Sequence, residues 1–255
     1  MQIIHALVFG IFGDREGSIR YLTTQATKFD KCLATMYYPL HAGAIRNHVQ
    51  NAQIRKAFCT TLKRHSSLPT IVMYNGKIPD EFKLCPRVVY KHIELANTKV
   101  PRGAAHYKYM RTKFEAWKLM QCKRVLWADL DTIFVRDPAL VFQFCPPTKD
   151  MCAVWDQGLE GRPNYFNAGV MVLRPSERTY NELNNLSMSG PPQIFGDQDT
   201  TNELYRGKWH RMPIQCNFQR TCCHKRMDWK NVIIVHSKVY ELTPYDRQRI
   251  LGRHQ

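Results

Sequence analysis

Two aspartates directly after an apolar run are the residues of this sequence best placed to do chemistry. Asp129 and Asp131 follow residues 125–127 (Val-Leu-Trp), an uncharged run typical of a strand that is covered on both faces. Residues two apart in an extended chain point to the same side, so both carboxylates are expected to reach one cation while Leu130 points into the core. Carboxylate oxygens suit Mg²⁺ and Mn²⁺, which often share their coordination with substrate phosphates. The sequence therefore predicts a metal–diphosphate site here, unless the aspartates only begin a turn or cap a helix.

Polar residues at the ends of other predicted elements could complete this site. His236 ends a predicted strand, and a neutral imidazole can join two carboxylates around Mn²⁺. Asp197 and Gln198 lie where a predicted helix begins. Lys113 and Lys238 could offer positive charge to a diphosphate. Taken singly, each of these residues is also compatible with an ordinary role, as a packed histidine, a helix start or a solvated lysine.

The elements that must position these residues alternate between strands and helices. Apolar runs predict strands over 31–38, 69–74, 87–93, 124–128, 132–135, 151–155, 165–173 and 231–236. Helical spacing predicts helices over 44–65, 104–120 and 175–186 and from 196 onward, with a helical turn at 139–144 and Ser176 as a cap. This order predicts an α/β fold with right-handed βαβ units, in which helices flank a Rossmann-like, mostly parallel central sheet. We expect residues 1–30 to form an N-terminal extension packed on a single domain over 31–255.

The charge balance points to an anionic partner. Lysine and arginine number 37 and aspartate and glutamate 21, so the formal net charge is +16. Such a surplus favours a nucleotide, a nucleic acid, an acidic glycan or a membrane surface, although a basic surface can also serve solubility alone. The basic residues are spread along the chain, and no helix-turn-helix, RNA-recognition or zinc-finger signature is present. We therefore expect no nucleic-acid partner.

Cysteine usage and hydropathy give an expectation about the compartment. Nine cysteines lie singly apart from Cys222 and Cys223, without metal-binding spacing. Reduced thiols in a reducing compartment are the simplest interpretation, with a few disulfides as the alternative. No run approaches the length of a transmembrane helix, and the apolar run Ile3–Phe12 lacks the basic flank and cleavage motif of a signal peptide. We expect a soluble protein and favour the cytoplasm.

Four motifs in a fixed order resemble those of glycogenin-like members of glycosyltransferase family 8. The first is Thr112-Lys113-Phe114 with Trp117, which leads into the acidic motif of residues 123–137. The others are Phe166-Asn167-Ala168-Gly169-Val170, Gly196-Asp197-Gln198 with Asn202, and Val235-His236. Their order and rough spacing resemble the family from about Leu33 to about Lys238.

The resemblance implies a GT-A fold and a retaining enzyme that moves a hexose from a nucleotide sugar, most often UDP-linked, to a hydroxyl of a carbohydrate or protein acceptor. It implies Mn²⁺, with Mg²⁺ as an alternative, held by Asp129, Asp131 and His236 and bridging the diphosphate leaving group. Lys113 and Lys238 would contact the diphosphate or the sugar. A homodimer would be compatible with this family.

The same resemblance assigns the remaining site residues. Thr35 and Tyr37 would lie against the uracil. Four polar residues would line the sugar pocket: Asp156, Asn167, Asp197 and Gln198. Either Asp197 or Gln198 would be the catalytic residue at the anomeric carbon, as a nucleophile in a double displacement or as a stabiliser of an oxocarbenium-like state.

Two other functions compete with this interpretation. A metal-dependent nucleotidyltransferase could use a similar acidic pair, but it would give no reason for the motifs at 166–170 and 196–198. A non-catalytic basic module could hold nucleic acid or an anionic glycan by charge alone. Retention of both Asp129 and Asp131 favours the enzyme.

Overall fold

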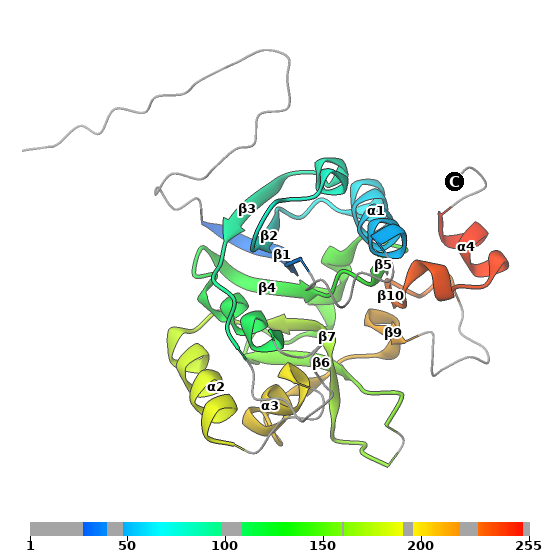
Figure 1. Ribbon diagram of the computed structural model, residues 1–255. Helices are drawn as coiled ribbons and strands as arrows, with labels where there is room; N and C mark the ends of the chain where they lie inside the picture. The colour runs from blue at the N-terminus through cyan, green and yellow to red at the C-terminus, as the bar shows by residue number, and fades with distance from the viewer. Residues whose placement is uncertain are drawn as a thin grey trace, which may run out of the picture.

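The computed structural model describes residues 28–39, 48–97, 109–159, 161–190, 196–219 and 229–251. Its centre is a seven-stranded sheet with the strand order β3-β2-β1-β4-β7-β6-β8 (Figure 1). These strands are β1 (Phe29–Tyr37), β2 (Thr70–Tyr74), β3 (Val88–His92), β4 (Cys122–Ala128), β6 (Met151–Trp155), β7 (Phe166–Leu173) and β8 (His210–Arg211). A separate three-stranded sheet has the order β5-β10-β9, with β5 (Thr132–Phe134), β10 (Ile234–His236) and β9 (Phe218–Gln219).

The central sheet is mostly parallel, as the sequence predicts. Strand β1 runs parallel to β2 and β4, β2 runs parallel to β3, and β6 runs parallel to β8. Helix α1 (His48–His65) lies between β1 and β2 in the chain, which gives the predicted strand–helix–strand unit. Strand β7 is the exception, because it runs antiparallel to both β4 and β6.

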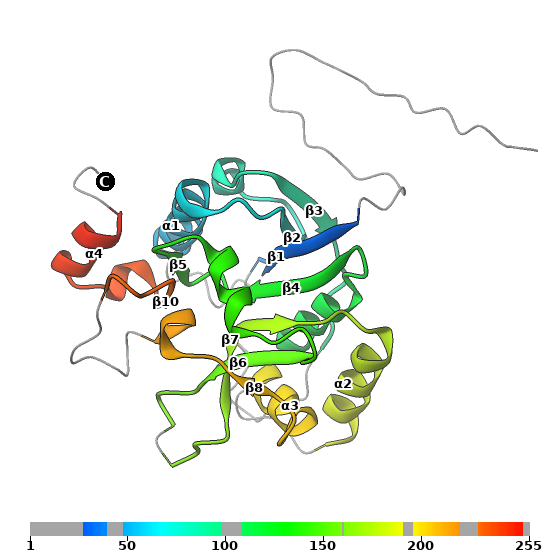
Figure 2. The ribbon, with the colours of Figure 1, turned by 180° about the vertical axis from the view of Figure 1, so that it is seen from behind.

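Both faces of the sheet are buried under helices. Leu126 belongs to the apolar cluster that includes Phe58 of α1, whereas its neighbour Trp127 belongs to the cluster that includes Leu183. This alternation is that of a strand covered on both faces, as predicted for the run before the acidic pair. Leu183 lies on α2 (Glu177–Ser189), and Figures 1 and 2 show α1 and α2 on opposite sides of the sheet.

The helices agree with the prediction in position more than in type. Helix α2 follows Ser176, whose hydroxyl accepts a hydrogen bond from the Thr179 amide at 3.2 Å, as expected of a cap. The prediction of an α-helix over 104–120 is wrong for the residues that the structure describes there. They form the 3₁₀ helix η4 (Met110–Lys118) instead. The other helices are α3 (Asp197–Leu204), α4 (Pro244–Leu251), and the 3₁₀ helices η2 (Asp80–Leu84), η5 (Pro138–Phe144), η6 (Ile214–Cys216) and η7 (Val239–Glu241).

Some predictions fall on residues outside the described ranges. They include the extension up to residue 27, the first residues of two predicted helices (44–47 and 104–108) and the pair Cys222 and Cys223. Strand β1 begins at Phe29, two residues before the predicted start of the main domain.

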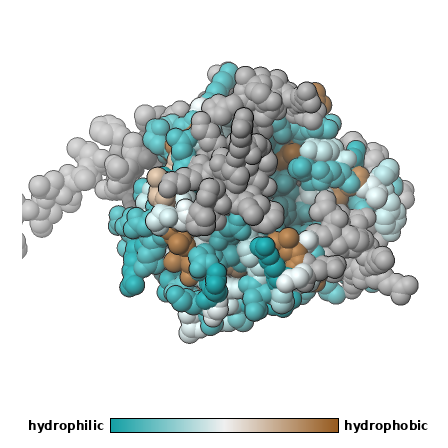
Figure 3. All heavy atoms as spheres, turned by 60° about the horizontal axis from the view of Figure 1, so that its bottom comes forward, coloured by the Kyte–Doolittle hydropathy of each residue, from teal (hydrophilic) through white to brown (hydrophobic). Residues whose placement is uncertain are grey.

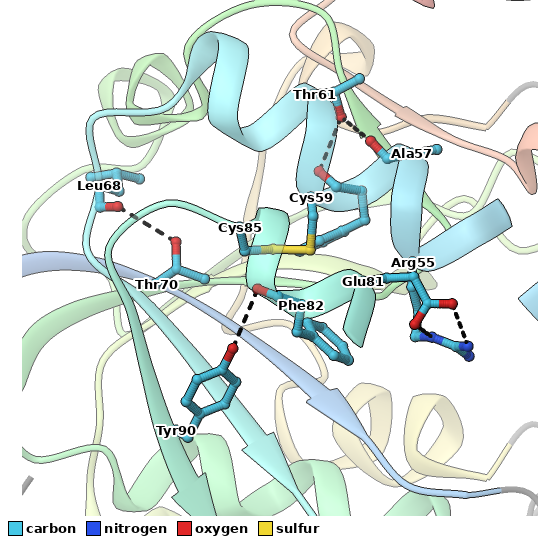
Figure 4. Close-up of a disulfide and its surroundings, with 11 residues drawn as sticks. Arg55, Ala57, Cys59, Thr61, Leu68, Thr70, Glu81, Phe82, Cys85 and Tyr90 are labelled. Atoms are coloured by element: carbon cyan, nitrogen blue, oxygen red, sulfur yellow. Dashed lines mark hydrogen bonds and ion pairs between the residues drawn. A yellow bond between two sulfur atoms is a disulfide. The ribbon is translucent and has the colours of Figure 1, made fainter. Parts of the chain in front are cut away.

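Six cysteines form disulfides, so the expectation of reduced thiols is wrong for them. Cys59 of α1 bonds Cys85 just after η2 (Figure 4), and the pairs Cys32–Cys122 and Cys145–Cys152 complete the set. Spacing could not reveal these pairs, because each partner comes from a different element of the fold. Within the described residues Cys216 is a buried free thiol.

Among the coloured residues of the face that Figure 3 displays, most are hydrophilic and the apolar ones form small, separate patches. Among the described residues, no helix is long and apolar enough to cross a membrane. The C-terminal helix α4 lies beside α1 and β10 (Figure 2), and the Arg64 guanidinium of α1 donates to the backbone oxygens of Ile250 and Leu251.

Candidate active site

The acidic pair lies in a turn between β4 and β5. The amide of Thr132 donates to the backbone oxygen of Asp129 at 3.1 Å, and the Thr132 hydroxyl donates to the same oxygen at 2.7 Å. The predicted extended geometry is therefore wrong, but the turn still brings Asp129 and Asp131 to one side. Leu130 packs against the core beneath them, as expected.

Strand β10 brings His236 to this turn. Because β10 runs antiparallel to β5, His236 lies opposite Thr132, the residue directly after Asp131. The amide of Ser237 donates to the backbone oxygen of Asp131 at 2.9 Å, and His236 Nε2 lies 3.3 Å from Asp131 Oδ1. One ligand atom from each of Asp129, Asp131 and His236 lies within 4.8 Å of the others.

This group has the chemistry of a divalent-metal site. Two carboxylates and an imidazole suit Mn²⁺ or Mg²⁺. The buried His236 Nδ1 finds no hydrogen-bond partner among the described residues, so the protein does not use both ring nitrogens for hydrogen bonds of its own. Burial disfavours charge on both groups, yet their mutual attraction lowers the pKa of Asp131 and raises the pKa of His236. The donor set therefore fits the predicted metal.

Lys113 joins the metal side of the site to α3. Its side chain is almost completely buried, and its ammonium lies 3.1 Å from Asp129 Oδ1, 2.7 Å from Asp197 Oδ2 and 3.2 Å from the Ala168 backbone oxygen. Burial opposes this charge, but the two carboxylates raise the pKa of Lys113. The ammonium of Lys113 is therefore held within the protein by two ion pairs and by a hydrogen bond to the backbone.

The start of α3 holds the two predicted catalytic residues. Gly196 precedes them with φ of 59°, a left-handed conformation that favours glycine. Burial raises the pKa of Asp197, and the nearby Lys113 counters part of this effect. Gln198 is held at both ends of its amide: Oε1 accepts from the Ala168 amide at 2.9 Å, and Nε2 donates to Asp156 Oδ2 at 2.8 Å.

A second group of predicted residues meets at Asp156. The side-chain amide of Asn167 donates to Asp156 Oδ2 at 3.2 Å, next to the bond from Gln198. Asp156 Oδ1 accepts from the Gly158 amide at 2.9 Å. The structure therefore brings Asp156, Asn167, Asp197 and Gln198 close to the acidic pair, with residues 167–169 of β7 between the two groups.

Two contributors to the site escape prediction from the sequence. Asn217 is fully buried, and its side-chain amide donates to Asn167 Oδ1 at 3.0 Å. Nothing in the sequence signals it, because it lies in the irregular link between η6 and β9. The indole of Trp127 donates to Asp129 Oδ1 at 2.7 Å. The position of this tryptophan, two residues before the acidic pair, is a signal from which its role could be inferred.

The three remaining predicted ligand contacts differ in their surroundings. Thr35 is fully buried within β1, and the half-buried Tyr37 packs edge-on against Phe82. Lys238 is about half exposed and pairs with Glu241 at 3.3 Å, and its charge also helps to lower the pKa of Asp131. The residue after Tyr37, Tyr38, is closer to the site: its pKa is raised to about 12, chiefly by burial and then by the carboxylate of Asp197.

Comparison with known proteins identifies the family of the chain. The model of the family described as nucleotide-diphospho-sugar transferase matches residues 103–238, more than half of the chain. UDP-glucuronate:xylan alpha-glucuronosyltransferase 2 of Arabidopsis thaliana is 30% identical over 118 residues, 45% of this chain and 17% of the relative. Glycogenin-1 of Mus musculus is 25% identical over 157 residues, 58% of this chain and 45% of the relative. The chain thus spans less than half the length of these two relatives.

A solved structure shows the same fold. The galactosyltransferase LgtC, in complex with donor and acceptor sugar analogs, superposes with a TM-score of 0.61 at 13% identity, covering 86% of this chain and 93% of that one. The chain belongs to the nucleotide-diphospho-sugar transferase family and is a GT-A-fold member of glycosyltransferase family 8, related to glycogenin.

Proposed function

We propose that this chain is a retaining, metal-dependent hexosyltransferase with a UDP-linked donor and a hydroxyl acceptor on a carbohydrate or protein. The observation that carries the proposal is the convergence of Asp129, Asp131 and His236 beside the ion pair of Lys113 and Asp197. Family membership favours sugar transfer over a nucleotidyltransferase or a non-catalytic basic module.

The metal ligands in this proposal are Asp129, Asp131 and His236. Mn²⁺, or Mg²⁺ in its place, would neutralise the negative charge of the diphosphate leaving group. The +16 net charge of the chain would also attract the anionic donor toward this site.

The two candidates at the anomeric carbon receive different roles. Both ends of the Gln198 amide are engaged, with Ala168 and Asp156, so we assign it the task of positioning α3 and the sugar pocket. The buried carboxylate of Asp197 carries the charge that could stabilise an oxocarbenium-like sugar. Lys113 would keep that carboxylate ionised and correctly oriented.

Calorimetric titration of UDP tests this proposal. UDP is titrated into the wild type and into Asp131→Ala, in one series with Mn²⁺ present and in a second series with EDTA present. We expect binding that needs Mn²⁺ and is lost in the variant, because the variant lacks one of three metal ligands. A panel of UDP-sugars that includes UDP-glucose and UDP-glucuronate would then identify the donor by UDP release. Equal UDP affinity in Mn²⁺ and in EDTA would refute the metal–diphosphate site.

The disulfides support a second proposal, about where the chain folds. Cytosolic thiols are generally kept reduced, whereas six of the nine cysteines are paired here. We therefore propose an oxidising compartment in place of the expected cytoplasm. Mass-spectrometric mapping after alkylation without reductant should find Cys59 linked to Cys85. Alkylated, unlinked thiols at both positions would contradict the proposal.

A further inference from the structure

Gly169 is the point at which β7 meets the candidate metal ligands. It lies within β7, and unlike Gly76, Gly196 and Gly207 it does not have a positive φ. Its backbone conformation is therefore open to any residue, so the reason for a glycine here must be space.

The imidazole of His236 fills the space where a side chain of Gly169 would be. A Cβ atom built on Gly169 would lie 2.0 Å from His236 Cε1, 2.7 Å from Nδ1 and 2.8 Å from Nε2. Carbon atoms that are not bonded meet at about 3.5–4.0 Å, so even an alanine cannot share this space with the ring. The nitrogen-bearing edge of the imidazole thus lies directly on the backbone of β7.

The backbone of Gly169 also contacts the acidic turn. The backbone oxygen of Gly169 accepts from the Asp129 amide at 2.8 Å, which extends the ladder between β4 and β7. Strand β7 is hydrogen-bonded to β4 on one side and β6 on the other, and its middle is fully buried. Because close-packed strands give way less readily than a side chain that is partly exposed to solvent, an added methyl group would displace the His236 ring and leave the strand in place.

We propose that Gly169 is a positioning residue whose missing side chain seats the His236 imidazole at the metal site. This inference rests on the proposed function, because it assumes that His236 is a metal ligand. The glycine of the Phe-Asn-Ala-Gly-Val motif is thereby needed for the space that it leaves free, and neither for a turn nor for a substrate contact.

Manganese binding in a double-mutant cycle tests the proposal. Mn²⁺ affinity in the presence of saturating UDP is measured by electron paramagnetic resonance for wild type, Gly169→Ala, His236→Ala and the double variant. Gly169→Ala should weaken Mn²⁺ binding about 10-fold or more, as expected when a metal ligand loses its support. In the His236→Ala background the same change should have no further effect, because the alanine at position 236 leaves room for the new methyl group. Gly161→Ala is the matched control, since a Cβ there meets nothing within 4 Å.

Thermal unfolding separates this inference from the proposed function. Without metal, Gly169→Ala should have a lower Tm than the wild type. In the His236→Ala background the same substitution should lower the Tm less. Wild type that binds no Mn²⁺ would contradict the proposed function, and the Tm values would still decide whether Gly169 seats the ring. Unchanged Mn²⁺ binding in Gly169→Ala, or additive losses of Mn²⁺ affinity or Tm in the double variant, would overturn the inference.

Discussion

The candidate site has two halves that are built in different ways. The metal half consists of Asp129, Asp131 and His236, charged or ionisable groups that remain partly open to solvent and include an imidazole nitrogen without a partner among the described residues. The sugar half consists of Asp156, Asn167, Gln198 and Asn217, whose side chains bond to one another. The difference indicates that the first half offers ionisable groups that suit a cation, whereas hydrogen bonds between its own side chains hold the second.

Residues 167–169 of β7 lie between the two halves. Asn167 bonds to the sugar half through its side chain, and the backbone of Ala168 bonds to both Gln198 and Lys113. Gly169 contacts the metal half through Asp129 and His236. Three consecutive residues of one central strand can therefore fix the position of one half relative to the other.

Lys113 joins Asp129 of the metal half to Asp197 at the start of α3, so its loss should have the largest effect. Lys113→Met would leave the buried carboxylate of Asp197 without its counter-ion, which typically costs about 3–5 kcal/mol. Urea unfolding should show this loss, and a second change, Asp197→Asn, should restore much of it by removing the unpaired charge. The exposed pair Lys123–Asp30 is the control, since its removal should cost only about 0–1 kcal/mol. Equal costs for the two pairs would show that Lys113 is not a buried counter-ion.

Asp131→Asn should break the metal half alone. Since even the outer-shell partners of metal ligands are worth about 10–100-fold in affinity, we expect Mn²⁺-dependent UDP binding to fall about 100-fold or more. The unfolding free energy should not fall comparably, because the sugar half and its hydrogen bonds stay intact. Calorimetry and urea unfolding on the same samples check both statements. Asp150→Asn, at an exposed carboxylate that precedes β6 and pairs with Arg174, should bind UDP like the wild type. An Asp131→Asn protein whose unfolding free energy falls while its UDP affinity stays at the wild-type value would contradict the separation of the halves.

The same contrast explains what the sequence could predict. The strand at 124–128 and the helix that begins at Asp197 follow from a local apolar pattern and a glycine-led turn. His236 reaches the acidic turn only because β10 pairs antiparallel with β5, but the pair Asp129 and Asp131 can be inferred from the sequence alone. Asn217 cannot, because its role depends on a contact with Asn167, fifty positions away in the chain.

Other differences have equally specific causes. Helical spacing alone does not separate an α-helix from the 3₁₀ helix at Met110–Lys118. Disulfide pairs such as Cys32–Cys122 join residues that are close only after β1 and β4 have paired.

Asn217→Ala should disturb the sugar half alone and by the smallest amount. It removes the hydrogen bond to Asn167 Oδ1, which still accepts from the Gly169 amide at 3.0 Å, so the expected cost is about 1 kcal/mol in urea unfolding. Mn²⁺-dependent UDP affinity should stay at the wild-type value, while the rate of sugar transfer should fall, because Asn167 and through it Asp156 lose part of their orientation. Asn185→Ala, at an exposed position of α2, should change neither quantity. If Asn217→Ala instead weakened UDP binding as much as Asp131→Asn, the two halves would have to be regarded as one network.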